Sequence, residues 1–229
     1  MRQAKGSLIA FIDADMTVRA DWLESLALSH RKHGWDYAGC EMAVYTECDT
    51  WTARYDKTLY GFPVEKYLKE RNFVHTGCLT TTQDVFNTVG LFDTQMTSQG
   101  DHEFGERVSD AGFNQQFISE AVMYHPARTN LHTWLKKQSR IGRGATEKRR
   151  LHPEIVWGST LSNPRRFLPP HPGRFHERLT DAVDDPTLAE SIAFYALDTA
   201  SKYARTVGSL REQYRAKFEK HTKGTDGTR

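Results

Sequence analysis

The sequence is short of cysteine, of net charge and of long apolar runs. Its three cysteines, Cys40, Cys48 and Cys78, have neither the spacing of a metal-binding module nor that of a disulfide framework, which favours a reducing cytosol. The 31 basic and 29 acidic residues leave a formal charge of only +2, so we expect no nucleic-acid partner. No uncharged apolar run reaches membrane-spanning length, and residues 1–7 do not resemble a signal peptide. These absences predict a cytoplasmic protein.

What the sequence does contain begins with a predicted strand at residues 8–12. Its five residues are all apolar, a pattern typical of a strand buried on both faces of a parallel sheet. Asp13 and Asp15 follow at once, and alternate residues of an extended segment point the same way, so both carboxylates can face one site. Such a pair suits a divalent cation and the phosphates that it carries. An acidic turn explains the pair equally well, since Asp is common in turns.

Helical and strand patterns alternate as far as residue 150, which predicts an α/β fold. Asp21 and Glu24 have the spacing of a capping box at a helix start, and Gly34 is the expected end of that helix. Further helices are expected at 50–69 (with an aromatic-rich connection), 83–89, 101–111 and 129–150 (interrupted at 142–144), and strands at 36–45, 73–82 and 116–124.

The composition changes after Leu151, where five prolines mark an irregular connection. Asp185 and Pro186 then predict the start of a long amphipathic helix. Its apolar positions are Leu188, Ile192, Ala196, Ala200, Tyr203, Val207 and Leu210, and its basic positions are Lys202, Arg205, Arg211, Arg215 and Lys217. We expect the apolar face to pack against the rest of the chain; the alternative is peripheral association with a membrane surface.

Three blocks of sequence resemble family 2 glycosyltransferases. Residues 4–15, followed by Asp21-Trp22-Leu23, resemble the family's metal-binding region with its Asp-x-Asp motif. Residues 90–113 resemble its acceptor-side motif, and residues 125–144 resemble the segment that follows in one bacterial branch. The resemblance implies a GT-A-like α/β fold, with a mixed, mostly parallel sheet flanked by helices. It divides the chain into a GT-A domain at 1–150 and a helical extension at 151–229.

The resemblance also implies site residues. Asp13, Asp15 and His125 would bind Mg²⁺ or Mn²⁺, with Asp13 also close to the donor's ribose. Asp101 would be the catalytic base, and its alternative is a plain helix cap. Glu103 would share the acidic role, because a glycine precedes Asp101 where the family usually has Glu.

The remaining implications concern substrates. Arg140 and Arg143, one helical turn apart, would bind the diphosphate of a nucleotide-sugar donor, with a UDP-sugar favoured; a solvated basic face explains them equally well. The acceptor would be a carbohydrate or a lipid-linked molecule, in polysaccharide biosynthesis. Sugar transfer would invert the anomeric centre, in the cytoplasm or at the cytoplasmic face of a membrane.

The family begins with two strand–helix units that hold the nucleotide, and this chain starts after them. We therefore expect an N-terminally truncated domain and weak or absent transfer by the isolated chain; micromolar affinity for a UDP-sugar with Mn²⁺ would contradict this. Two alternatives remain open. One is a catalytically inactive fragment or binding subunit, and the other is a haloacid dehalogenase-like phosphatase with Asp13 as nucleophile and Asp15 as general acid.

Overall fold

The computed structural model describes residues 4–155 and 160–225, which form two compact units. The first unit comprises Met1–Glu47, Tyr60–Gln95 and Gly100–Ala127. The second comprises Cys48–Leu59, Met96–Gln99 and Arg128–Arg229. The predicted domain boundary at residue 150 stays a prediction.

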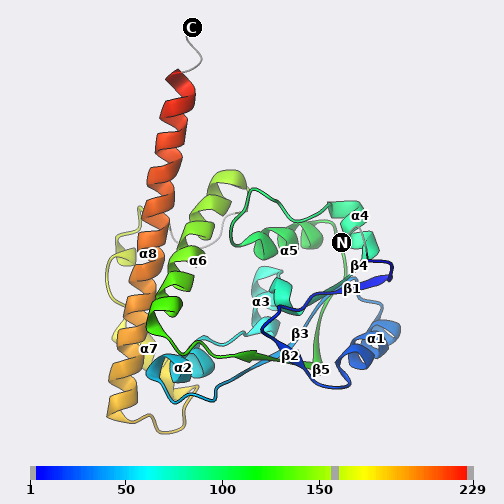
Figure 1. Cartoon of the computed structure of the whole chain (residues 1–229), viewed down its shortest axis with the longest axis horizontal. Coiled ribbons are helices and arrows are strands. Elements are labelled where there is room, and N and C mark those ends of the chain that lie inside the picture. The colour runs from blue at the N-terminus through cyan, green and yellow to red at the C-terminus, as the bar shows by residue number, and fades with distance from the viewer. Residues whose placement is uncertain (1–3, 156–159, 226–229) are drawn as a thin grey trace. The chain divides into compact units, whose positions relative to one another are not determined.

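The first unit is built on a five-stranded mixed sheet with the strand order β1-β4-β3-β5-β2 (Figure 1). Its strands are β1 (Leu8–Ala10), β2 (Thr17–Val18), β3 (Tyr37–Tyr45), β4 (Leu79–Thr82) and β5 (Gln115–Pro126). The α/β class and the mixed sheet are confirmed. However, only β3 and β5 pair in parallel, and the other three pairings are antiparallel rather than mostly parallel as expected. An apolar run indicates burial but not the direction of the neighbouring strand.

Short helices accompany this sheet in the first unit. They are α1 (Trp22–His33), α3 (Val64–Arg71), the 3₁₀ turn η2 (Thr76–Cys78), α4 (Gln83–Val89) and α5 (Gly100–Asp110). The core includes Trp35, Tyr37, Leu79 and Phe104, none of which is exposed. Aromatic side chains supply much of its buried apolar area and hold helices against the strands.

Two local predictions in the first unit are wrong. β1 is an edge strand that pairs only with β4, and Ala10 is exposed, so the strand is not buried on both faces. The Asp21 carboxylate accepts hydrogen bonds from Arg19 at 2.5 and 2.9 Å and makes no capping bond to α1. The nearby guanidinium competes successfully with the helix amides for this carboxylate. Gly34 does end α1, in the left-handed conformation with φ of 63°, as predicted.

The second unit is helical. It contains α2 (Trp51–Tyr55), α6 (Leu131–Leu151), the 3₁₀ turn η3 (Pro164–Arg166), α7 (Pro172–Thr180) and α8 (Leu188–Thr225), while the π-helical turn η1 (Asp56–Tyr60) follows α2. α6 and α8 run side by side and in parallel (Figure 1). Among the described residues, no helix is both long and apolar enough to cross a bilayer.

The predicted interruption of α6 at residues 142–144 is wrong, because the helix is continuous. A Cβ atom at Gly142 would lie 1.9 Å from the carbonyl oxygen of Arg205 on α8, and one at Gly208 would lie 1.9 Å from that of Ser139. These two glycines therefore allow the two backbones to approach each other closely. They serve helix packing rather than helix breaking.

The predicted start and face of the long helix are also corrected. α8 begins at Leu188, where Thr187 and Glu190 form a capping box: the Thr187 amide and hydroxyl donate to Glu190 Oε2 at 2.9 and 2.7 Å. The apolar face expected to be buried is instead turned outward, with Ile192 63 % and Leu210 43 % exposed.

Candidate active site

Asp13 and Asp15 lie in the turn between β1 and β2, and both are exposed. The turn is closed by the Met16 amide, which donates to the Asp13 carbonyl at 3.1 Å. The Asp13 carboxylate rests against η2: a Cβ atom at Gly77 would lie 2.8 Å from Asp13 Oδ2 and 3.2 Å from the sulfur of Met16. The absence of a side chain at Gly77 therefore makes room for this carboxylate.

Asp101 lies in the first turn of α5, one residue after the helix starts. Its Oδ1 accepts a hydrogen bond from the His102 amide at 2.9 Å. Since Asp101 is inside the first turn rather than before it, the position is not that of the plain helix cap considered as the alternative.

The Cys78 thiol, at the end of η2, is buried and has a raised pKa. Burial raises its pKa well above the usual value, and the charges of Cys40, Asp101 and Asp13 raise it further. Of these two aspartates, Asp13 contacts this turn, because its carboxylate lies against Gly77. Both of these predicted site residues belong to the first unit.

Sequence reasoning assigned no role to Gly77 and Cys78, which it interpreted only as an interruption of a strand. The signal was present, because an isolated glycine within a strand pattern often marks a close approach of another group. Here the approaching group is the Asp13 carboxylate.

Glu103 has a different environment from Asp101. It is 1 % exposed, and both of its carboxylate oxygens accept hydrogen bonds from Arg107, at 2.5 and 2.9 Å. Arg107 also donates to the carbonyls of Val89 and Leu91, so this ion pair connects α5 to the end of α4. The predicted catalytic role of Glu103 stays a prediction, although these contacts favour a role in positioning the loop.

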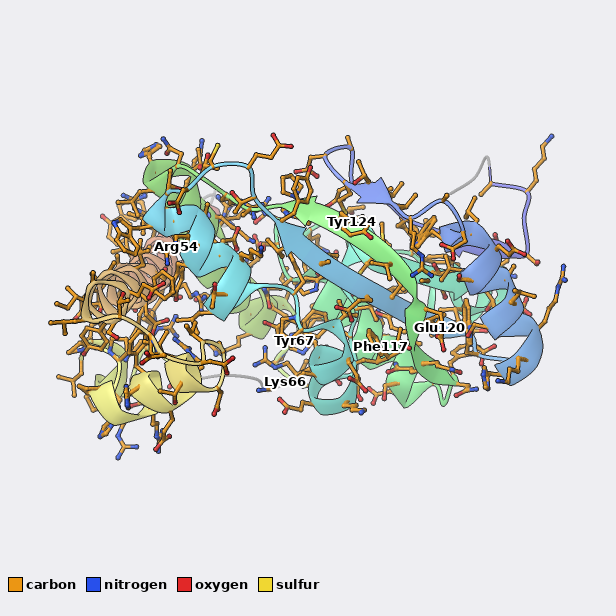
Figure 2. The ribbon with its side chains drawn as sticks, turned by 90° about the horizontal axis from the view of Figure 1, so that it is seen from below. Arg54, Lys66, Tyr67, Phe117, Glu120 and Tyr124 are labelled. Atoms are coloured by element: carbon orange, nitrogen blue, oxygen red, sulfur yellow. The ribbon has the colours of Figure 1, made fainter. Side chains whose placement is uncertain are left out.

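His125, near the end of β5, is 4 % exposed and lies within a group of rings in the first unit. Its ring centroid is 4.8 Å from that of Phe62, which also contacts His75 at 5.2 Å. Tyr67, on α3 (Figure 2), stacks on Phe73 at 5.2 Å. These contacts describe aromatic packing around His125, and its predicted role as a metal ligand stays a prediction.

The metal site can be tested against the chemistry of the side chains. Within residues 4–155 and 160–225, no group of three or more His, Cys, Asp or Glu side chains could hold a metal ion, so Asp13, Asp15 and His125 do not form such a group. The two carboxylates alone fit the way in which Mg²⁺ is bound at many phosphate sites. There, one or two carboxylates are supplemented by waters and by oxygens of the substrate's phosphates.

Arg140 and Arg143 belong to α6 in the second unit. Arg140 is exposed, whereas Arg143 donates to the Thr97 hydroxyl at 2.7 Å. Glu147 accepts from the Thr97 amide and hydroxyl at 2.9 and 2.8 Å, so the segment Met96–Gln99 is held against α6. The predicted contact of both arginines with a diphosphate stays a prediction.

One charged residue of α6 was not predicted as notable. Burial lowers the pKa of Lys137 to about 8, and the neighbouring charges of Arg128, Arg140 and Arg205 act in the same direction. Asp56 opposes them. The first half of α6 therefore lies in a region of concentrated positive charge.

Comparison with known proteins relates the chain to enzymes of sugar transfer. Residues 1–90 match the model of the glycosyl transferase family 2. Over 145 residues the chain is 32 % identical to glycosyltransferase AglE of Haloferax volcanii, covering 63 % of this chain and 47 % of that protein. Over 153 residues it is 25 % identical to the pre-mycofactocin glycosyltransferase of Mycobacterium tuberculosis, covering 64 % of this chain and 32 % of that protein. The chain thus spans about half the length, or less, of these relatives.

Among solved structures, the fold resembles that of the mannosyltransferase PcManGT from Pyrobaculum calidifontis, determined in complex with GDP-mannose and Mn²⁺. The TM-score is 0.54 at 11 % identity, covering 93 % of this chain and 64 % of that one. At this identity the likeness concerns the fold alone.

Proposed function

We propose that this relative of the family 2 glycosyltransferases transfers a sugar from a nucleotide-sugar donor to an acceptor hydroxyl. The relationship itself, predicted from three sequence blocks, is confirmed by the family match and by the two related glycosyltransferases. One structural observation supports the proposed chemistry most directly. It is the position of the Asp13 carboxylate against Gly77 in the turn Thr76–Cys78, within the same unit as Asp101.

The two carboxylates suit the two charges that change during transfer. Asp101 takes the proton of the acceptor hydroxyl as the acceptor oxygen forms a bond to the anomeric carbon. The bond from that carbon to the β-phosphate oxygen breaks, and the nucleoside diphosphate leaves with the bonding electron pair. A single base without a covalent intermediate inverts the anomeric centre.

Asp13 and Asp15 would hold a divalent cation, Mg²⁺ or Mn²⁺, together with the phosphates of the donor. When bound, such an ion offsets the charge that develops on the diphosphate leaving group. The role of Arg140 and Arg143 in binding a diphosphate, predicted from sequence, belongs to the same proposal. The donor is a UDP-sugar in the prediction from sequence, and the GDP-mannose bound by the fold neighbour adds a GDP-sugar as a second donor to test.

The acceptor and the cellular place belong to the same proposal. A carbohydrate or lipid-linked acceptor would fit polysaccharide biosynthesis in the cytoplasm or at the cytoplasmic face of a membrane.

Nucleotide binding tests the role of Asp13 without requiring turnover. Calorimetry with UDP and with GDP, with and without Mn²⁺, should show binding weaker than micromolar that Mn²⁺ strengthens. Asp13→Asn should reduce the Mn²⁺-dependent affinity about 10-fold or more. Asp110→Asn makes the same exchange at another exposed aspartate of the first unit, at the end of α5. It is the matched control and should leave the affinity unchanged. Equal affinity with and without Mn²⁺ would contradict the proposed metal site.

Sugar transfer tests the role of Asp101. With UDP- and GDP-sugars and an oligosaccharide acceptor, Asp101→Asn should retain nucleotide binding and lower the transfer rate by about 10²–10⁴-fold. An unchanged rate would remove Asp101 as the base. Steady hydrolysis of p-nitrophenyl phosphate that is abolished by Asp13→Asn would instead favour the phosphatase alternative.

A further inference from the structure

The outward face of α8 carries a stripe of exposed apolar side chains. With 3.6 residues per turn, six of them fall within an arc of about 100°. They are Leu188, Ile192, Tyr203, Val207, Leu210 and Tyr214, with exposed fractions between 39 % and 78 %. An open hollow of about 460 Å³ lies along this face, lined by Leu210, Arg211, Gln213, Tyr214 and Lys217.

The opposite face of α8 is already occupied by α6. The Trp134 indole donates to the Ser201 hydroxyl, and the Ser209 hydroxyl donates to the Gly142 carbonyl, both at 2.8 Å. Small and polar side chains therefore make the helix pair. This pairing holds the apolar stripe away from α6, so the stripe is not needed to complete the fold of the second unit.

Positive charge accompanies the C-terminal part of the stripe. By helical geometry Arg211 lies beyond one edge of the stripe, and Lys217 lies within it, beyond Leu210 and Tyr214; both are exposed, and neither forms an ion pair within the described part of the chain. Lys202, on the same side as Lys217, donates to the carbonyl of Arg165 at 3.0 Å. Between residues 199 and 218 the one acidic residue of α8 is Glu212, which is 1 % exposed and accepts hydrogen bonds from Arg215.

We propose that α8 lies along an anionic lipid surface, with its apolar stripe at the boundary of headgroups and acyl chains and with Arg211 and Lys217 at lipid phosphates. An amphipathic helix with Lys and Arg beside a wide apolar face binds in the plane of such a surface. Tyrosines such as Tyr203 and Tyr214 are favoured at this depth, because the ring is apolar and the hydroxyl reaches water. The proposal does not depend on the proposed transfer activity.

Charge favours lipid over a second copy of the chain as the occupant. Two copies joined through the stripe would bring Arg211 and Lys217 of both chains to one interface, with no exposed acidic residue of the described stripe to pair with them. Anionic headgroups supply the missing negative charge and attract each basic residue near the surface.

Co-sedimentation of the full chain with vesicles tests the proposal. We expect binding to phosphatidylglycerol–phosphatidylcholine vesicles, weakened by salt, and little binding to phosphatidylcholine alone. The double variant Arg211→Glu, Lys217→Glu should lower the partition coefficient about 10-fold or more. The matched control Arg31→Glu, Lys32→Glu reverses two exposed charges on α1 in the first unit and should retain more of the binding.

The apolar contribution is tested separately by Leu210→Ser with Tyr214→Ser, which preserves every charge. This variant should also bind vesicles weakly, while its circular dichroism and thermal midpoint stay close to those of the original chain. If the α1 control lowers the partition coefficient as much as the α8 variant does, then net charge alone explains the binding and the proposal is overturned. Unchanged vesicle binding by the serine variant would also overturn the proposal. So would a different result: no binding to vesicles, together with an original chain that is dimeric and a serine variant that is monomeric in sedimentation equilibrium.

Discussion

At the scale of single residues, the Asp13 carboxylate can take its position because Gly77 has no side chain. Asp13 occupies the space that a Cβ atom of Gly77 would need, and Cys78, the next residue, is affected by the charges of both Asp13 and Asp101. The turn Thr76–Cys78 therefore leaves room for the Asp13 carboxylate. A change at this turn should alter binding more than stability.

Gly77→Ala tests this relationship. The added methyl group would lie 2.8 Å from Asp13 Oδ2, and a flexible carboxylate can move away at little cost to the fold. We expect the Mn²⁺-dependent affinity for UDP or GDP to fall about 10-fold, with the thermal midpoint lowered by no more than about 2–4 °C. The control Gly173→Ala, in α7, should leave the affinity unchanged. An unaltered affinity in Gly77→Ala would show that the position of Asp13 does not matter.

The lowered pKa of Lys137 predicts how the free energy of unfolding depends on pH. Its pKa of about 8 in the folded chain lies below the ordinary 10.5, so the unfolded chain binds more protons between these values. The contribution of Lys137 to the free energy of unfolding therefore rises with pH across this window. Lys137→Met removes the buried charge, so it should stabilise the chain most below about pH 8 and progressively less toward pH 10.5.

Urea unfolding of both chains across this pH range measures the difference directly. Lys136→Met, at the exposed neighbouring position, is the matched control and should show no such trend. Parallel stability profiles for the original chain and Lys137→Met would contradict the lowered pKa.

At the scale of elements, the parallel pair α6 and α8 is organised by small residues. The bonded pairs Trp134–Ser201, Gln138–Arg205 and Gly142–Ser209 all differ by 67 residues in sequence, so the helices stay in one register along their contact. Gly142 and Gly208 mark where the backbones come closest. Close packing at these points leaves no room for a methyl group.

Gly142→Ala and Gly208→Ala should therefore each destabilise the second unit. Forcing a methyl group into this contact should lower the free energy of unfolding by about 1–3 kcal/mol or more. At an uncrowded helical position the same exchange stabilises by about 1 kcal/mol. In the control Gly173→Ala the added methyl group would meet only the His171 side chain, at 3.2 Å, so we expect a change between zero and this value. Urea denaturation provides the values. Stabilisation by all three substitutions would contradict the close approach of α6 and α8.

At the scale of the whole molecule, the two units bury their functional groups differently. The first unit encloses Cys40 and Cys78 in its core, whereas Cys48 lies exposed in the second. Burial raises the pKa of Cys40 to about 11 and that of Cys78 well above its usual value. Since the thiolate is the reactive form, the two buried thiols should be inert in the folded chain.

Titration with Ellman's reagent tests this arrangement. The folded chain should release about one equivalent quickly and three after unfolding in guanidinium chloride. Cys48→Ser should abolish the fast phase. Rapid reaction of two or more thiols in the folded chain would show that the core of the first unit is not closed.

The prediction from sequence was most accurate where the signal is local. Helix α4 has the predicted bounds Gln83–Val89, and Gly34, Gly90 and Gly112 follow helices with positive φ values as expected, because a cap involves only neighbouring residues. The family relationship was also within reach, since it rests on motifs in order along the chain. For the site, sequence indicated Asp13 and Asp101 but not Gly77, against which the Asp13 carboxylate lies.

Only the three-dimensional structure showed which face of an element packs against its neighbour. Hydrophobic periodicity shows that two faces of α8 differ, yet it does not show which face packs. The packed face proved to be the one with Ser201, Gly208 and Ser209, because small residues let α6 approach closely. The more apolar face was left outward and becomes available to another partner. Likewise, the apolar run at residues 8–12 did not show which of its side chains are buried, and the direction of the strand next to β1 follows from the path of the chain in between.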